Sequence, residues 1–344
     1  MRKRFIWISI CLIGSVIFVT VLALMSSSAN EAENGFIRNL PPLKIVGESF
    51  KNIKNNAWYI GGANDSGVYL GNNIVPGRIA KVDNHLTSYS EISLTGFDTV
   101  KIHRGAYIQI DSLNLYLMDG TKPLILRANI VDLHFRQRLK ATYFTGGIPL
   151  TYTSLALRSI YEGVGAVLIK KNLESEAIKT TKLLQKQIDG IFCTDGELVK
   201  VPGPSSKMIY VYYYRNQFLC TDSNLNLLYK GKTIDTISRA QIKVAKIVST
   251  GETTMAAPPL YVNKRACANS KYLFVQSALR ANNETEYMIK DVSMIDVYAI
   301  ADGKYQFSFY LPDFRGFKVR DFKVYGQSLY ALYDHYLYKY QLNF

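Results

Sequence analysis

Short runs of β-branched and aromatic residues, separated by turn residues, make up most of the chain after residue 43. The clearest example lies between Lys207 and Asp235, where Met208–Tyr214, Gln217–Thr221 and Leu225–Lys230 have the pattern of three strands joined by tight connections. Strands of this length at this spacing indicate an antiparallel meander. This meander is the unit from which the rest of the chain can be interpreted.

Similar hairpins return about every 45 to 50 residues, and several of them turn at an Asp-Gly pair, such as Asp119-Gly120 and Asp302-Gly303. A repeat of this length is in the range of propeller blades. A blade is a four-stranded antiparallel sheet that buries both faces only by stacking on its neighbours around an axis. The roughly 300 residues after residue 43 therefore predict an all-β, six-bladed propeller, with seven blades as the alternative.

The last blade offers only three strands before the chain ends, at residues 318–324, 328–333 and 336–341. We expect an N-terminal strand, from residues 36–40 or 44–50, to complete this sheet and cover its open edge. A β-sandwich or a parallel β-helix would show shorter repeats, and both fit the spacing less well.

Only one stretch has helical character. Leu173–Ile188 matches a helical face in part, and it equally predicts a strand over Ala177–Leu184 followed by one helical turn.

The N-terminus begins with a basic head, residues 1–4, in which residues 2–4 are Arg or Lys; Phe5–Met25 follows and contains no charged side chain. This run exceeds the 7–15 residues of a signal-peptide core and reaches the length of about 20 residues that spans a bilayer. We expect an uncleaved transmembrane helix and single-pass anchor, with the basic head in the cytoplasm. The alternative is a signal peptide cleaved near Ser27-Ser28-Ala29. Residues 26–42 are then a tether, and residues 43–344 form the propeller on the periplasmic or extracellular side of the cytoplasmic (inner) membrane.

Arg2, Lys3 and Arg4 supply +3 of the formal net charge of +14, and in the remaining chain the Lys and Arg residues are scattered singly and do not cluster in a tract. A basic soluble surface explains this pattern, and an exported domain does not favour nucleic acid as a partner. Cys11 lies in the apolar N-terminal run, which leaves Cys193, Cys220 and Cys267. One disulfide among these three and buried free thiols remain alternatives.

The hairpins YLMDGTKPLILRAN, DGIFCTDGELV, YVYYYRNQFLCTDSNLNLLYKGKTIDT, MIDVYAIADGKYQFSFYLPDF and YALYDHYLYKYQL resemble those of β-propeller proteins of the broad NHL, YVTN and six-bladed type. More narrowly, the chain resembles uncharacterised single-anchor propellers of Gram-negative bacterial envelopes. The resemblance covers nearly the whole part after the anchor and implies its fold. It carries no catalytic motif.

Candidate chemistry is sparse. His85, His103, His134 and His335 lie far apart, and Asp119, Asp195, Asp222, Asp302 and Asp334 mostly sit beside turn residues, so turn chemistry explains the aspartates better than a metal site does. No nucleophile motif or phosphate-binding loop appears. We therefore expect no catalytic residue, no metal and no cofactor.

The candidate ligand-binding residues are Asp195, Tyr213, Arg215, Asn263 and Lys264. They flank the starts of strands that would line the channel of a propeller, where basic and aromatic groups bind anionic or sugar-like ligands. The competing interpretation is that they are ordinary strand-end residues. The expected function is a non-catalytic binding or scaffolding propeller that contacts a protein or envelope component, with room for a small-molecule ligand. The alternative is a metal-dependent propeller hydrolase or lyase that acts at the channel.

Overall fold

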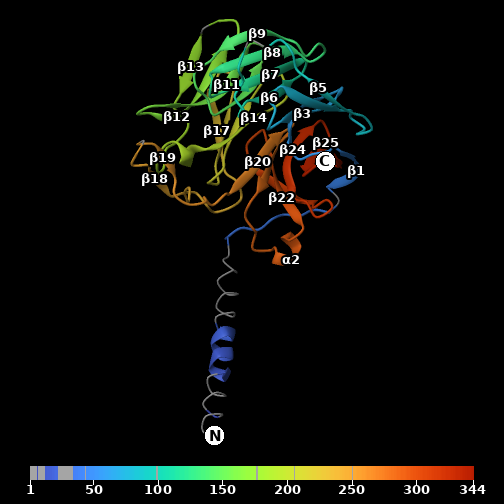
Figure 1. Ribbon diagram of the computed structural model, residues 1–344. Coiled ribbons are helices and arrows are strands. Elements are labelled where there is room, and N and C mark those ends of the chain that lie inside the picture. The colour runs from blue at the N-terminus through green and yellow to red at the C-terminus, as the bar shows by residue number, and fades with distance from the viewer. Residues whose placement is uncertain are drawn as a thin grey trace.

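The computed structural model describes residue 6 and residues 12–21, 34–42, 44–97, 100–175, 177–204, 206–249 and 251–344. Within this part of the chain there are six four-stranded antiparallel sheets and one two-stranded hairpin (Figure 1). Among the described residues, helical structure is limited to residues 6 and 12–21, a 3-10 turn η1 (Phe192–Thr194) and one short helix, α2 (Glu286–Ile289).

The sheets follow chain order and are numbered here as blades 1 to 6. The first three blades are built from β2 (Trp58–Asn64), β3 (Gly67–Asn72), β4 (Arg78–Val82) and β5 (Tyr89–Ser93), then β6 (Tyr107–Asp111), β7 (Asn114–Asp119), β8 (Leu124–Asn129) and β9 (Phe135–Lys140), then β10 (Gly146–Thr151), β11 (Ser154–Tyr161), β12 (Gly165–Asn172) and β13 (Ile178–Thr181).

Blades 4 and 5 are built from β14 (Gly196–Lys200), β15 (Met208–Tyr212), β16 (Phe218–Thr221) and β17 (Leu227–Gly231), then β20 (Asn263–Ala268), β21 (Tyr272–Ser277), β22 (Val292–Ala299) and β23 (Tyr305–Pro312). The hairpin β18 (Val244–Lys246) and β19 (Thr253–Met255) lies in the connection between these two blades. Blade 6 contains β24 (Val319–Tyr325), β25 (Ser328–Tyr333), β26 (Tyr336–Leu342) and, as its outer strand, β1 (Ile45–Asn52).

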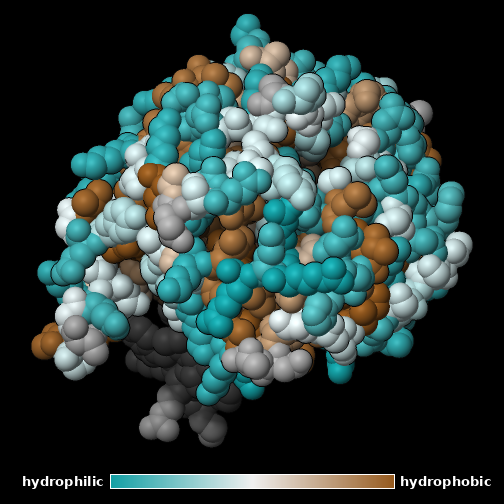
Figure 2. All heavy atoms as spheres, turned by 90° about the horizontal axis from the view of Figure 1, so that it is seen from above, coloured by the Kyte–Doolittle hydropathy of each residue, from teal (hydrophilic) through white to brown (hydrophobic). Residues whose placement is uncertain are grey.

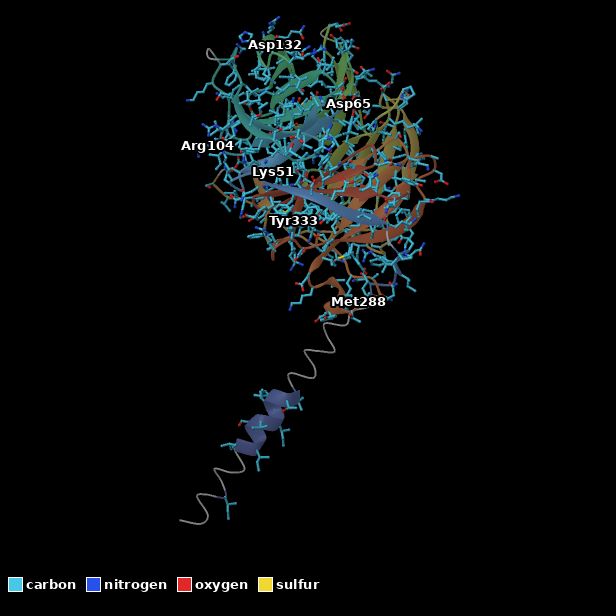
Figure 3. All side chains as sticks on the ribbon, turned by 90° about the vertical axis from the view of Figure 1, so that its right-hand side faces the viewer. Lys51, Asp65, Arg104, Asp132, Met288 and Tyr333 are labelled. Atoms are coloured by element: carbon cyan, nitrogen blue, oxygen red, sulfur yellow. The ribbon has the colours of Figure 1, made fainter. Side chains whose placement is uncertain are left out.

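The first strand of each blade lies beside the first strands of the neighbouring blades, from β2 through β6, β10, β14 and β20 to β24 and back to β2. The ring is therefore closed, and the prediction of six blades is confirmed. The expected N-terminal strand that completes the last blade is also confirmed. We call the pairing of β1 with β26 the clasp, in which Ile45 pairs with Leu342 and Asn52 with Tyr336. In Figure 3, Lys51 on β1 and Tyr333 on β25 belong to this shared blade.

The hydrophobic core lies between the blades because each sheet must bury both faces. Between blades 6 and 1, for example, Trp58, Leu70 and Val82 pack with Tyr330 and Leu332. The outer surface is mixed in character: Figure 2 shows hydrophilic residues over most of one face with hydrophobic ones scattered among them.

Turn aspartates connect the strands as the sequence indicates. The Asp222 carboxylate accepts hydrogen bonds from the backbone N–H groups of Asn224 and Asn226, both at 2.8 Å, and Leu225 adopts a left-handed φ of 58° in the same turn. Asp302 accepts the N–H of Lys304 at 3.1 Å. The turn interpretation is thereby confirmed for these two residues.

Two alternatives from the sequence are resolved. The described part of residues 173–188 contains no helix, and β13 (Ile178–Thr181) is the outer strand of blade 3, so the helical interpretation is wrong. Cys193, Cys220 and Cys267 are buried free thiols, and burial raises the pKa of Cys267 to about 12.

The expected span Phe5–Met25 lies partly outside the described residues. Among the residues that the structure describes, we find no helix with the length and apolarity needed to cross a membrane.

Residues 34–40, which we call the latch segment, pack against blade 5. Phe36 is buried with Val262, Leu279 and Ala281. The backbone N–H of Ser308 donates to the Asn39 carbonyl at 2.8 Å, and that of Asn282 donates to the Phe36 carbonyl at 2.8 Å. The chain is therefore fixed to blade 5 before it crosses to blade 6 as β1.

Candidate functional site

The axis of the ring holds two cavities of about 810 Å³ each, one toward each face of the propeller. We call the face where the first strand of each blade begins the start face, and the face where these strands end the end face. Gln109, Ile148 and Leu198 line both cavities, so the two meet near the middle of the channel.

Two ion pairs cross the channel, and each connects two blades that are separated by a third blade. The Lys200 ammonium of blade 4 lies 2.7 Å from both carboxylate oxygens of Asp111 in blade 2. The Lys323 ammonium of blade 6 lies 3.6 Å from Oε1 of Glu197 in blade 4. These contacts hold charged groups in place where the inner strands are closest to the axis.

A buried arginine reaches the start-face cavity from the second strand of blade 3. Arg158 donates to Oγ1 of Thr145 at 2.7 Å and to the Ile191 carbonyl at 2.8 Å, and it forms an ion pair with Oδ1 of Asp195 at 2.7 Å. Its Nε is buried and has no hydrogen-bond partner in the described part of the chain. A buried donor without a partner costs free energy, which the other contacts of this guanidinium offset.

Asp195 is positioned by the turn that precedes blade 4. The Asp189 carboxylate accepts the N–H groups of Phe192 and Cys193, at 2.8 and 2.9 Å, and this organises η1. The N–H of Asp195 then donates to the Phe192 carbonyl at 2.9 Å, which ends the turn and directs the chain into β14. Burial raises the pKa of Asp195 to about 6 against the opposing effect of Arg158.

This pKa predicts a pH-dependent stability. The Asp195 carboxyl has a pKa of about 6 in the folded chain and an ordinary value of 3.8 when exposed, so the folded state binds the extra proton between these values. The free energy of unfolding of the wild type should therefore fall by about 2 kcal/mol, relative to Asp195→Asn, as the pH rises from about 4 to about 8. Chemical denaturation of both proteins across this range measures it. A difference that is constant with pH contradicts the assignment.

Blade 5 contributes the second arginine of the start-face cavity. Arg265 lines this cavity with an exposed side chain, and its guanidinium makes no hydrogen bond or ion pair with the described residues. The nearby carboxylate of Glu197 is held by the N–H of Ala266, which donates to Oε2 at 2.7 Å. Tyr213 completes this wall, and burial raises the pKa of its hydroxyl.

The structure brings two of the five candidate residues from the sequence to the cavity, namely Asp195 and Tyr213. Arg215 is buried instead: its guanidinium stacks 3.7 Å from the ring centroid of Tyr212 and donates to the Gln185 carbonyl at 3.1 Å. Asn263 is buried too, and its Nδ2 donates to the carbonyls of Tyr212 and Arg215. Lys264 is exposed and lines neither cavity.

Sequence reasoning missed Arg158 and Glu197, and it took Asn263 and Lys264 from the stretch 262–265 as candidates in place of Arg265. Glu197 could have been found because side chains two positions apart along a strand point to the same face, and Glu197 lies two positions after the candidate Asp195. In β20 the same rule fails, because a register shift between Asn263 and Arg265 changes which side chain faces the channel.

Metal ligands do not assemble in the described part of the chain. No group of three His, Cys, Asp or Glu side chains there is arranged to hold a metal ion, and none of the four histidines lines either cavity.

Comparisons with known proteins concern the fold. No model of a protein family matches the sequence, and no curated protein matches it. The chain is similar in structure to a member of the DUF4221 family from Bacteroides vulgatus, with 11% identity over 87% of this chain and 97% of that one, at a TM-score of 0.55. It is also similar to virginiamycin B lyase from Staphylococcus aureus, with 12% identity over 87% and 99% of the chains, at a TM-score of 0.50. At these identities the likeness shows the propeller fold alone.

Proposed function

We propose that this propeller is a non-catalytic binding module, held at the outer side of the cytoplasmic membrane. In this proposal the start-face cavity binds an acidic group of a protein or other envelope component. The observation that carries the proposal is the Arg265 guanidinium, which lines that cavity and makes no hydrogen bond or ion pair with the described residues. Guanidinium groups bind carboxylates and phosphates through two parallel hydrogen bonds, which give both strength and orientation.

The surrounding groups support recognition of a hydrogen-bonding segment. Arg158 adds a second guanidinium to the cavity lining, and Asp195 and Glu197 offer acceptors for amide or hydroxyl groups of the same ligand. Tyr213 and the exposed Tyr143 add aromatic surface at the rim. A concave site with a few convergent polar groups and aromatic walls is typical of binding clefts.

The proposed location depends on the sequence. Phe5–Met25 has the length of a transmembrane anchor, and the basic residues before it favour a cytoplasmic N-terminus. A reporter enzyme that is active only outside the cytoplasm, fused after Phe344, should then be active. Activity of a cytoplasm-dependent reporter at the same position would contradict the orientation. The alternative of a metal-dependent hydrolase or lyase has no specific observation in its favour.

The binding proposal is tested by substituting the free arginine. In affinity capture from solubilised membranes, Arg265→Gln should retain about tenfold less partner than the wild type, because losing a charge-assisted hydrogen bond costs on the order of 1.5 kcal/mol or more. Arg265→Lys should retain part of the binding. Arg104→Gln, at an exposed arginine labelled in Figure 3, is the matched control and should bind as the wild type does. Equal capture by Arg265→Gln would contradict the proposal.

A further inference from the structure

The end-face cavity extends away from the axis. It begins at Lys200 and Lys323 on the inner strands and continues between blades 1 and 2, past Tyr69 on β3 and Lys81 on β4, as far as Ile92 on β5. The cavity is thus elongated, with one end in the channel and the other between two blades. A volume of about 810 Å³ is in the range of small-molecule sites.

The part between the blades has apolar walls. Ile92 of blade 1 faces Ile110, Ile130 and Leu133 of blade 2, and these side chains belong to one hydrophobic cluster. At the rim, Leu113 is 58% exposed and Val131 is 82% exposed. Exposed apolar side chains next to an apolar cavity indicate a site that an apolar ligand covers.

The charges in the same cavity are not all balanced. Asp111 is engaged with Lys200, and Oδ1 of Asp65 accepts the Tyr325 hydroxyl at 2.8 Å. Lys81 has no such partner: its ammonium stands 5.5 Å from the ring centroid of Tyr69 and makes no hydrogen bond or ion pair with the described residues. An ammonium beside apolar walls therefore lacks a counter-ion in this part of the cavity.

We infer that the end-face cavity binds an amphiphile with one apolar chain and an acidic head. The chain lies between blades 1 and 2, and the carboxylate or phosphate head pairs with Lys81. Burial of the methylene groups of the chain favours binding, and the head group gains an ion pair in a partly desolvated site. The site between blades 1 and 2 lies away from the part of the channel where the two cavities meet, and its test does not depend on the proposed function.

Photolabelling of the full chain in native membranes tests this inference. The probe is a palmitate analogue with a diazirine near the end of its chain, and labelled peptides are identified by mass spectrometry. The label should fall on residues 110–133, and excess palmitate or lysophosphatidate should reduce it about tenfold. Hexadecanol at the same concentration should leave most of it. Palmitate and lysophosphatidate carry a carboxylate and a phosphate head, so their relative effect identifies the head group.

The variants separate the two ends of the ligand. Lys81→Met should reduce labelling because the head loses its cation, and Val131→Asp should reduce it because a charge at the exposed rim opposes entry of the chain. Lys264→Met and Arg265→Gln, which leave the end-face cavity intact, should label as the wild type does. Label spread over the whole surface, labelling unchanged in both Lys81→Met and Val131→Asp, or equal displacement by hexadecanol would overturn the inference.

Discussion

Arg38→Ala should lower the free energy of unfolding by about 3–5 kcal/mol, because it leaves two buried carboxylates without their cation. The Arg38 side chain in the latch segment is almost fully buried against blade 5. Its Nε donates to Oδ1 of Asp296 at 2.8 Å, its Nη1 pairs with Glu284, and its Nη2 donates to the Leu279 carbonyl at 3.0 Å.

Chemical denaturation followed by circular dichroism measures this effect. The exposed Arg104→Ala is the control and should change the free energy of unfolding by less than about 0.5 kcal/mol. The triple variant Arg38→Met, Glu284→Gln, Asp296→Asn should recover part of the loss, since it removes the uncompensated charges as well. Wild-type stability of Arg38→Ala would show that the latch segment does not hold blade 5.

The second large effect concerns the clasp. Phe50→Pro with Lys51→Pro should lower the free energy of unfolding by at least about 2 kcal/mol, because consecutive prolines must remove at least one ladder N–H between β1 and β26. Loss of β1 would also expose the edge of β26 (Tyr336–Leu342) and promote association between chains. Phe50 further contributes ring contacts with Phe314 and Tyr338 that the substitution removes.

Hydrogen exchange identifies the clasp as the cause. The amides of β26 should exchange faster in the double-proline variant, and the amides of blade 3 should keep their protection. The matched control, Phe50→Ser with Lys51→Ser, keeps both N–H groups and should preserve most of the protection of β26. If β26 is equally protected in the proline variant, the ring does not depend on this clasp.

The architecture could be predicted because it depends on short-range patterns. Strand alternation and turn residues such as Asp222 and Asp302 mark each hairpin, and the missing fourth strand of the last blade requires a strand from the N-terminus. These signals lie within a few residues of each other along the chain. The presence of β1 follows from the requirement to cover an edge, whereas its register, in which Ile45 meets Leu342, comes from the structure.

The site was harder to predict because its residues come from different blades. Arg158 and Asp195 are distant in sequence, and no local motif around either residue predicts their ion pair. Asn263 and Lys264 were expected to face the ligand, yet the bulge in β20 presents Arg265 instead. The latch segment forms no strand and has no helical period, so its residue pattern does not predict that it is buried. In the structure its Arg38 forms ion pairs with Glu284 and Asp296 of blade 5.

The central claim, that the start-face mouth is the binding site, is tested most directly by a photoreactive phenylalanine derivative placed at Tyr143 or at Tyr152. Tyr143 lines the start-face cavity and is 46% exposed, whereas Tyr152 is 66% exposed in a turn that lines neither cavity. In native membranes the probe at Tyr143 should cross-link one partner, and Arg265→Gln should abolish that product. Equal cross-linking from Tyr152, or a Tyr143 product that persists in Arg265→Gln, would contradict the account.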